Sequence, residues 1–462
     1  MSEPGPPLTE LPARLEVQRR YFAEGLTRSR ESRLAALAAL RELLTGHADA
    51  LVAALQADLP RPALEAWASE LAVVRHEIDH ARAHLTEWLE PVRPSWRARQ
   101  PFDQAEVRRE PAGCVLILGP WNYPLHLVLA PLVAALAAGN CALLKPSELA
   151  PHTARLLAEL VGQVFHPGLV TVVQGGVETA QALLALPFDH IFFTGGPAVG
   201  RLVMRAAAEH LTPVTLELGG KSPCLVDQDV PLRRALQRIL WGKFFHAGQT
   251  CVAPDYLLVD ERIHDRLLVE AGRVLREFYG VDPRQSPDYA RIVSARHFAR
   301  LEALLAGQPV VWGGERDPAT RFFGPTLVDR PRLDSALLQE EIFGPILPVL
   351  SYRDLPEALA IVRALPPPLA LYVFSRDEGF VAQVLDGLRY GGACVNDTLL
   401  QLDHPELPFG GVGDSGLGRY HGRAGFDELT RPTSILRRSL AIETGLRFPP
   451  YGHKLGAVKR LV

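Results

Sequence analysis

The sequence predicts an α/β protein with two domains, each built on a mainly parallel sheet. Its 462 residues are more than one hydrophobic core usually organises. Short apolar runs alternate with Ala- and Leu-rich segments at helical spacing, which is the pattern of strand–helix–strand units. This alternation occurs twice, first up to about residue 217 and again from Leu218 to about Val395. We therefore expect two successive α/β domains.

The N-terminal part is predicted to be helical. Residues 1–9 are rich in Pro and Gly and are expected to be loose. In residues 11–88, Ala, Leu, Arg and Glu dominate, and apolar residues recur at helical spacing, as at Leu37 and Leu40. A Pro- and Arg-rich stretch at residues 91–111 interrupts this pattern and indicates a solvated arm or linker.

The first α/β series contains the clearest elements. Strands that are buried on both faces of a parallel sheet are continuous apolar runs. The expected strands are Cys114–Leu118, Cys141–Leu144, Leu169–Val173 and Ile191–Phe193. The expected helices between them are Leu127–Ala138, Ala150–Val164 and Glu178–Leu186.

Charge and cysteine content exclude several classes of protein. A formal net charge of −3 does not indicate the basic face of a nucleic-acid-binding protein. No signal peptide or hydrophobic C-terminal tail is visible, and the longest apolar run, Leu127–Ala138, is too short to cross a bilayer. The cysteines form no C-x-x-C pair, which argues against a zinc ribbon or a disulfide framework and favours a reducing compartment. We expect a cytoplasmic protein with no membrane or nucleic-acid partner. The five cysteines are Cys114, Cys141, Cys224, Cys251 and Cys394.

Two turns that follow predicted strands are candidates for binding a nucleotide. The strand Ile191–Phe193 runs into the Gly-rich turn Thr194–Gly200, and such a turn before a helix allows phosphate to approach the backbone. The turn is not a G-x-G-x-x-G motif, so alone it is weak evidence. The tetrad Lys145–Glu148 follows another strand and can hold ribose hydroxyls, although it also fits a plain helix start.

Cys251 and Glu217 are candidates for catalysis. Cys251 lies in a small, polar, Gly-containing loop where a thiol can meet substrate, whereas Cys114 and Cys141 lie inside apolar strands. The alternative for Cys251 is a buried structural thiol. Glu217 lies in an apolar run before Gly219-Gly220, where burial raises a carboxyl pKa and suits a general base. The alternative for Glu217 is a salt-bridged residue at a domain junction.

A competing motif is the run His76-Glu77-Ile78-Asp79-His80, which matches the H-E-x-x-H pattern of zinc peptidases. Two histidines four residues apart share one helix face, so metal binding is feasible. The third histidine of the longer metzincin pattern is absent, and the surrounding helix is highly charged. We therefore favour solvated side chains and expect no metal.

Taken together, these segments resemble the aldehyde dehydrogenase superfamily, and most closely its class-3 branch. The order and spacing of the motifs agree over roughly residues 15–452, which makes the combination highly specific. The matching segments are Pro120–Pro124, Lys145–Glu148, Phe193–Gly195, Leu216–Lys221, Gly248–Tyr256, Glu340–Pro345, Pro408–Gly413, Ser415–Gly416 and Tyr420–Gly422.

The resemblance implies oxidation of an aldehyde through a covalent intermediate. Cys251 would be the nucleophile that forms a thiohemiacetal and then a thioester. The side-chain amide of Asn122 and the backbone N–H of Cys251 would hold the oxyanion. Glu217 would activate the water that hydrolyses the thioester.

The resemblance also implies a site for NAD, with NADP possible. Glu341 would bind the nicotinamide ribose and Phe343 would pack beside it, while Lys145 and Glu148 would bind the adenosine ribose. The charge of Glu148 favours a free ribose diol and hence NAD, although class-3 relatives often accept both cofactors. The residues that would approach the pyrophosphate are Thr194, Gly195, Gly196 and Gly200.

The expected domains and substrate follow from the same resemblance. Tyr123, Trp241 and Phe409 would line a substrate tunnel suited to aromatic or medium-chain aliphatic aldehydes, and the protein would be a homodimer. The expected ranges are 1–90 and 112–217 for a Rossmann-like NAD(P)-binding domain, 218–395 for a catalytic domain, and 91–111 and 396–462 for oligomerisation or bridging segments.

Two departures from the family pattern leave alternatives open. Gly196-Pro197 replaces a turn that usually contains Ser, so a side-chain contact to pyrophosphate is lost. His246 stands where class-3 members usually have Asn, and we favour a neutral packing role over an effect on the acidity of the site. Two alternative hypotheses remain for the function of the whole chain. One is a CoA-acylating dehydrogenase, which Glu217 argues against, and the other is a protein that keeps the fold without catalytic activity.

Overall fold

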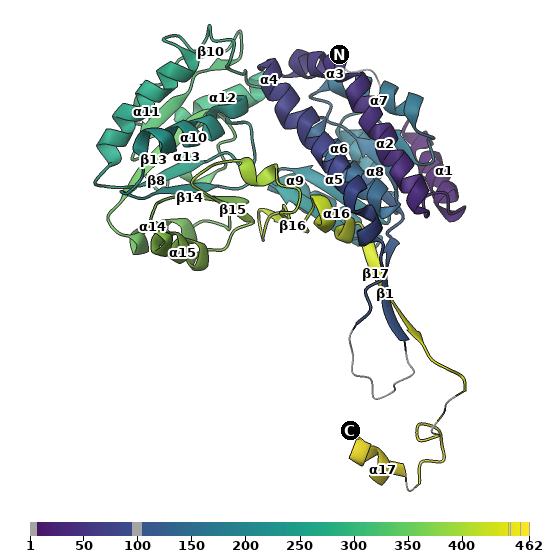
Figure 1. The fold of residues 1–462 in the computed structure, drawn as a ribbon. Coiled ribbons are helices and arrows are strands. Elements are labelled where there is room, and N and C mark those ends of the chain that lie inside the picture. Colours follow the sequence, from purple (N-terminus) through teal and green to yellow (C-terminus); the bar gives the residue numbers. More distant parts are fainter. Residues whose placement is uncertain (1–6, 95–103, 442, 444, 453, 462) are drawn as a thin grey trace. The chain divides into compact units, whose positions relative to one another are not determined.

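The structure is a computed structural model of the chain that describes residues 7–94, 104–441, 443, 445–452 and 454–461. The chain divides into two compact units. Unit 1 comprises residues 1–88 and 111–430, and unit 2 comprises residues 89–110 and 431–462. Both α/β sheets lie in unit 1 (Figure 1).

The N-terminal helices of unit 1 occupy the region that was predicted to be helical. Buried leucines at helical spacing, among them Leu37, Leu40 and Leu44, pack α2 into the core. The Ser29 hydroxyl accepts a hydrogen bond from the Ser32 N–H and caps the first turn of α2. A short 3₁₀ turn at Leu8–Glu10 precedes these helices where a loose segment was expected. The helices are α1 (Leu11–Ala23), α2 (Arg30–Gly46), α3 (Ala48–Asp58), α4 (Ala63–Ala66), the π-helical turn η2 (Trp67–Ala72) and α5 (Val73–Trp88).

The first sheet has six strands in the order β16-β6-β5-β2-β3-β4. All neighbours are parallel except β16, which runs antiparallel to β6. The four predicted strands and three predicted helices are confirmed with small shifts of their ends, whereas the two-residue β16 had no signal in the sequence. The strands are β2 (Cys114–Leu118), β3 (Cys141–Lys145), β4 (Val170–Val172), β5 (His190–Gly195), β6 (Val214–Leu218) and β16 (Gly416–Leu417). The helices are α6 (His126–Ala138), α7 (Pro151–Val164), α8 (Val177–Leu184) and α9 (Pro197–Ala208).

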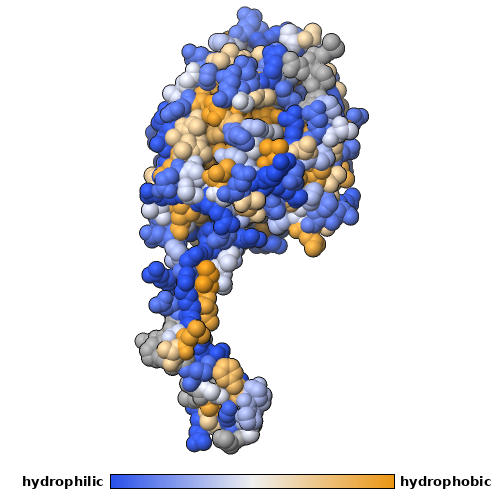
Figure 2. Space-filling model, turned by 90° about the vertical axis from the view of Figure 1, so that its right-hand side faces the viewer, coloured by the Kyte–Doolittle hydropathy of each residue, from blue (hydrophilic) through white to orange (hydrophobic). Residues whose placement is uncertain are grey.

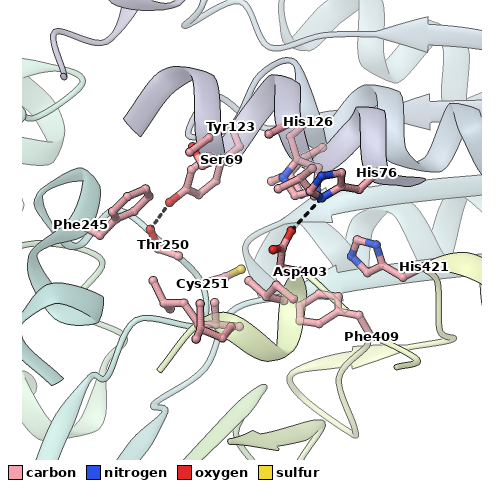
Figure 3. A pocket seen from close by; sticks show the side chains of 18 of the residues that line it. Ser69, His76, Tyr123, His126, Phe245, Thr250, Cys251, Asp403, Phe409 and His421 are labelled. Atoms are coloured by element: carbon pink, nitrogen blue, oxygen red, sulfur yellow. Dashed lines mark hydrogen bonds and ion pairs between the residues drawn. The ribbon is translucent and has the colours of Figure 1, made fainter. Parts of the chain in front are cut away.

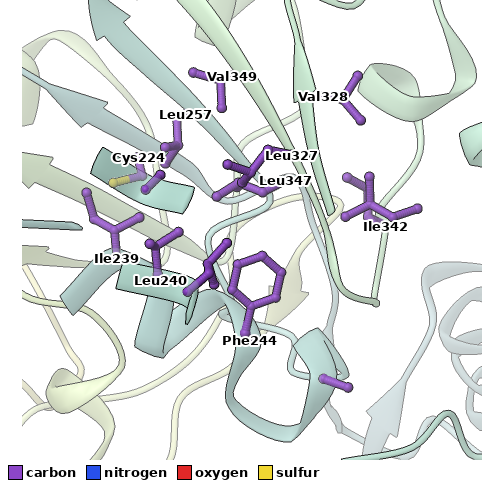
Figure 4. Packing of buried hydrophobic residues seen from close by; sticks show 14 of the residues in the cluster. Cys224, Ile239, Leu240, Phe244, Leu257, Leu327, Val328, Ile342, Leu347 and Val349 are labelled. Carbon is purple, nitrogen blue, oxygen red and sulfur yellow. The ribbon is translucent and has the colours of Figure 1, made fainter. Parts of the chain in front are cut away.

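The second sheet has seven strands in the order β15-β14-β7-β8-β13-β12-β9, and only β9 is antiparallel to its neighbour. Its core packs Leu240 and Phe244 of helix α10 against Leu257 and Leu347 of the sheet (Figure 4). The strands are β7 (Pro223–Val226), β8 (Tyr256–Asp260), β9 (Val310–Gly313), β12 (Thr326–Asp329), β13 (Ile346–Tyr352), β14 (Ala370–Phe374) and β15 (Gly392–Val395). The helices are α10 (Leu232–Phe244), α11 (His264–Tyr279), α12 (Ala295–Leu305), α13 (Ala336–Gln339), α14 (Leu355–Arg363) and α15 (Glu378–Gly387). The α/β class predicted from the two alternating series is therefore confirmed.

Shorter elements complete unit 1, and unit 2 has a sheet of its own. In unit 1 these are η3 (Phe245–Gly248), β10 (Arg316–Asp317), β11 (Phe322–Phe323), η4 (Leu400–Leu402) and α16 (Gly422–Glu428). Unit 2 contains the two-stranded sheet of β1 (Gln104–Pro111) and β17 (Thr430–Arg437), followed by α17 (Lys454–Leu461). The strand β1 replaces part of the solvated arm expected at residues 91–111, of which residues 95–103 lie outside the described residues. A strand that pairs with a segment more than 300 residues away leaves no local pattern to predict it.

Figure 2 shows hydrophilic and hydrophobic residues interspersed on one face. Within the described part of the chain, no helix has the length and apolarity that crossing a membrane requires.

Candidate active site

Cys251 lies where two pockets meet. Pocket A has a volume of about 310 Å³ and pocket B a volume of about 250 Å³, and Cys251 and Leu127 line both. Pocket A contains the three residues predicted for a substrate tunnel, which are Tyr123, Trp241 and Phe409. The predicted residues that line pocket B are Asn122, Thr194, Gly195, Gly196, Glu217, Glu341 and Phe343. A thiol between two pockets can contact one molecule on each side.

Sheet topology explains why pocket B forms. Strands β2, β5 and β6 are parallel neighbours, so their carboxyl ends lie at one edge of the sheet. Asn122 follows β2, Thr194–Gly196 lie at the end of β5, and Glu217 is the penultimate residue of β6. Ligands of open α/β sheets bind at this edge.

The loop that carries Cys251 is held in an unusual backbone conformation. His246, Ala247 and Gly248 have φ angles of 53°, 50° and 74°, in the left-handed region that non-glycine residues rarely adopt. A Cβ at Gly248 would come within 2.3 Å of the Gly344 carbonyl oxygen, so this position requires glycine. The Gln249 amide donates to the His246 and Arg291 carbonyls at 3.1 and 3.0 Å and fixes the turn.

Burial raises the pKa of the Cys251 thiol above its usual range, and the carboxyl groups of Glu341 and Glu217 add to the rise. Hydrogen bonds from the backbone N–H groups of Cys251 and Val252 oppose it. The thiol is half-buried, in contrast to the buried Cys114 and Cys141. The protonated thiol therefore needs a base nearby before it can act as a nucleophile.

Glu217 is a buried carboxyl group without a hydrogen-bond partner. Neither of its side-chain oxygens has one in the described structure, and the residue is 3% exposed. Burial raises its pKa well above the usual value, which Arg419 opposes and Glu428 reinforces. The alternative of a salt-bridged structural glutamate is therefore wrong. A carboxyl group of this kind is a suitable general base beside Cys251.

Asn122 connects the loop after β2 to the Cys251 loop. Its Nδ2 donates to the Gln249 carbonyl at 3.0 Å, and the residue is buried. The start of helix α6, four residues later, is held by the buried Glu70 of η2, which accepts from the N–H groups of Leu125 and His126 at 2.9 and 2.8 Å. The guanidinium of Arg61 donates to the other oxygen of Glu70. Sequence reasoning missed this pair because its significance depends on a contact with α6 that has no local signal.

Pocket B has the unpaired polar atoms that a nucleotide requires. The Thr194 hydroxyl and the Glu341 Oε1 atom are buried there without a partner among the described residues. Burial and the nearby Asp255 raise the pKa of Glu341 to about 8, against the opposing hydrogen bond from the Gly220 backbone. A Cβ at Gly219 would come within 2.0 Å of the Glu341 carboxylate, so a larger residue here would displace that side chain. Gly196 is the N-cap of α9; Pro197 has no N–H, and the N–H groups of Val199 and Gly200 bond to the Gly196 carbonyl, so the Ala198 N–H is the group that can donate to a phosphate.

The remaining predicted cofactor residues do not line pocket B. Lys145, at the end of β3, donates to the Glu148 carboxylate at 3.0 Å, and this ion pair lies outside both pockets. Gly200 lies in α9, where a Cβ would clash with the Leu218 side chain at 2.7 Å, so it lets α9 approach the sheet closely.

His246 is buried, and neither of its ring nitrogens has a partner among the described residues. Burial, with Arg61, lowers the pKa of His246 well below the usual value. This favours the neutral packing role.

His76 of the H-E-x-x-H segment lies in the wall of pocket A (Figure 3). His76 pairs with Asp403 at 3.5 Å, and Glu77 binds His421 and the Gly422 N–H. The described residues contain no group of three or more His, Cys, Asp or Glu side chains placed to hold a metal ion. The sequence could indicate His421 only through the Tyr420–Gly422 match, and it gave no signal for the pairing with Glu77.

Comparisons with known proteins agree with this geometry. The model of the aldehyde dehydrogenase family matches residues 17–435. The 4,4'-diaponeurosporen-aldehyde dehydrogenase of Staphylococcus aureus is 44% identical over 95% of this chain and 96% of its own. Aldehyde dehydrogenase family 3 member A2 of Mus musculus is 44% identical over 94% and 90%, and the dimeric NADP-preferring aldehyde dehydrogenase of Canis lupus familiaris is 43% identical over 94% and 96%. The substrate-bound structure of S. aureus AldH aligns with a TM-score of 0.95 and 43% identity over 97% of this chain and 99% of that one.

Proposed function

Since the chain belongs to the aldehyde dehydrogenase family and is an NAD(P)-dependent enzyme that oxidises aldehydes to acids, we propose that it works through a thioester on Cys251. The observation that carries the proposal is the position of Cys251 between pockets A and B. The aldehyde enters pocket A and the cofactor occupies pocket B. A resemblance to class-3 members agrees with the similarity to the family 3 relative.

Acylation begins when the Cys251 thiol loses its proton and Sγ bonds to the aldehyde carbon. Glu217 is the base whose raised pKa suits it to take this proton. The carbonyl π electrons move to oxygen, and the oxyanion accepts hydrogen bonds from Asn122 Nδ2 and the Cys251 N–H. Loss of hydride to NAD(P)⁺, the redox chemistry that the cofactor supplies when bound, leaves the acyl group on Cys251 as a thioester.

Deacylation uses water and Glu217. The carboxylate takes a proton from water as its oxygen bonds to the acyl carbon, and the Cys251 thiolate departs as the acid forms. Because Glu217, with its unpaired oxygens, lines pocket B together with Cys251, one group serves both steps in turn once the proton taken in acylation has been released to water. Pocket B would hold the cofactor through Glu341, Phe343 and the Thr194–Gly196 turn, with Lys145 and Glu148 proposed for the adenosine ribose.

Pocket A supports aromatic or medium-chain aliphatic aldehydes as substrates. Tyr123, Trp241 and Phe409 give it aromatic walls, and the Tyr123 hydroxyl is already bonded to the Thr250 hydroxyl at 2.5 Å. We also propose the predicted domain ranges, a homodimer and a cytoplasmic location. The location rests on the cysteines, all five of which are free thiols.

The test is a panel of aromatic and aliphatic aldehydes assayed with NAD and NADP, with and without CoA. We expect CoA-independent formation of NAD(P)H that is lost in Cys251→Ala and kept in Cys394→Ala, a matched substitution of another half-buried thiol. NAD(P)H formation by Cys251→Ala at the wild-type rate would overturn the mechanism. Strict dependence on CoA would favour an acyl-CoA product.

A further inference from the structure

Two buried histidines in the wall of pocket A each have a ring nitrogen that the proposed reaction does not use. His126 and His421 both line the pocket and are 8% and 3% exposed. The Nε2 atom of each ring has no hydrogen-bond partner in the described structure. The two ring centroids lie 6.2 Å apart. Leaving a buried polar group unpaired is unfavourable, so two such atoms on one pocket wall need an explanation.

His421 is held in place from several sides. Its Nδ1 bonds to Glu77, and the other oxygen of that carboxylate accepts from the Gly422 N–H at 3.0 Å. Tyr420 stacks on the ring at 4.2 Å, and Phe409 meets it edge-on at 5.7 Å. The backbone of His421 has a φ of 71°, a strained conformation for a non-glycine residue that commonly marks functional sites. These contacts fix the ring with Nε2 free.

The charge state of this wall favours a neutral ligand group. Burial, and secondly His421, lowers the pKa of His126 to about 3, so its ring is neutral at physiological pH. Burial alone would raise the pKa of Glu77, but His421 and the Gly422 N–H outweigh it and lower the pKa, which keeps the carboxylate ionised. Glu77 holds Nδ1 of His421, which leaves Nε2 as the ring nitrogen without a partner in the described structure. The carboxylates of Glu77 and Asp403 would repel an anionic ligand group at this wall.

Several other polar groups in pocket A are already paired. The Ser69 hydroxyl donates to the Glu65 carbonyl at 2.7 Å, and His76 pairs with Asp403. Figure 3 shows His126, His421 and Phe409 around the same space as Cys251. An aldehyde with a purely apolar body would leave both imidazole nitrogens unpaired, whereas a hydroxyl can donate to one of them.

We propose that His421 and His126 form a hydroxyl-binding site in pocket A that selects aldehydes carrying a hydroxyl group away from the reacting carbonyl. Glu77 is a positioning residue, because it acts through His421. This selection rests on the proposed function, since it places the aldehyde in pocket A with its carbonyl at Cys251.

The test compares 3- and 4-(hydroxymethyl)benzaldehyde with 3- and 4-ethylbenzaldehyde, which differ only by OH in place of CH₃. The readout is the ratio of kcat/KM for each pair, measured with saturating NAD(P). One hydrogen bond between neutral groups corresponds to a factor of about 3 to 10. We expect the ratio of at least one pair to fall by that factor in His421→Phe and in His126→Phe. The second variant leaves the Glu77 ion pair intact and so guards against a folding defect in the first.

His80→Phe is the matched control, because His80 makes tilted ring contacts with His84 and Trp88 on the same helix and does not line pocket A. It should keep the wild-type ratio. If His421→Phe and His126→Phe also keep it while Cys251→Ala abolishes turnover of all four compounds, the hydroxyl site is wrong and the proposed reaction stands. If Cys251→Ala still oxidises the ethyl compounds at the wild-type rate, the proposed reaction itself fails.

Discussion

Replacing Glu70 by Gln should destabilise the protein and slow catalysis. Glu70 is fully buried and accepts hydrogen bonds from Arg61 and from the N–H groups of Leu125 and His126. A glutamine offers one acceptor oxygen, so at least one buried donor is left unpaired, and Arg61 keeps a buried charge without its counter-ion. Breaking a buried ion pair from one side costs about 3–5 kcal/mol.

This loss of folding free energy should be measurable as a lower midpoint of thermal unfolding. Taking about 1.2 °C per kcal/mol for a unit of roughly 400 residues, the midpoint of thermal unfolding should fall by roughly 4–6 °C, measured by calorimetry or circular dichroism. The double substitution Arg61→Met/Glu70→Leu should recover part of the loss, because it removes both charges together. Glu87→Gln on the exposed side of α5 is the control and should stay within about 1 °C of the wild type.

The same substitution should lower kcat, since the N-terminus of α6 anchors the loop that carries Asn122. An unfolding midpoint of Glu70→Gln equal to that of the wild type would refute the reasoning about the buried pair. An unchanged kcat would refute the connection from Glu70 to Asn122.

Three further predictions concern the reaction, pH and metals. Glu217→Gln should slow the NAD(P)H burst seen on rapid mixing and lower steady-state turnover about 100-fold or more, because acylation and deacylation both lack their base; an unchanged steady-state rate contradicts this role. Burial raises the pKa of Glu65 to about 7 from 4.5, so the folded state holds an extra proton between these values and stability falls as pH rises through them. Between pH 5 and pH 8, the unfolding midpoint of Glu65→Gln should therefore decline less than that of the wild type, and equal declines would count against the raised pKa. Dialysis against EDTA should leave the rate of aldehyde oxidation unchanged. A loss of activity that added zinc restores would support a zinc site at His76–His80.

The sequence alone determined the parts of this protein that depend on near neighbours. Apolar runs and helical spacing located the strands and helices of the first series to within a few residues, because burial on both faces of a parallel sheet constrains each strand locally. The ordered motifs identified Cys251, Glu217 and Asn122 as candidates, and the structure brings all three to pocket B.

Tertiary structure alone decided what depends on distant contacts. The sequence placed an H-E-x-x-H pattern on one helix, but only the fold pairs Glu77 with His421 and so leaves an imidazole nitrogen free in pocket A. It placed Lys145 and Glu148 beside a cofactor, yet the fold pairs them with each other outside pocket B. The raised pKa values of Cys251 and Glu217 could not be predicted from the sequence either, because a pKa shift arises from burial and from charges that the chain brings together only on folding.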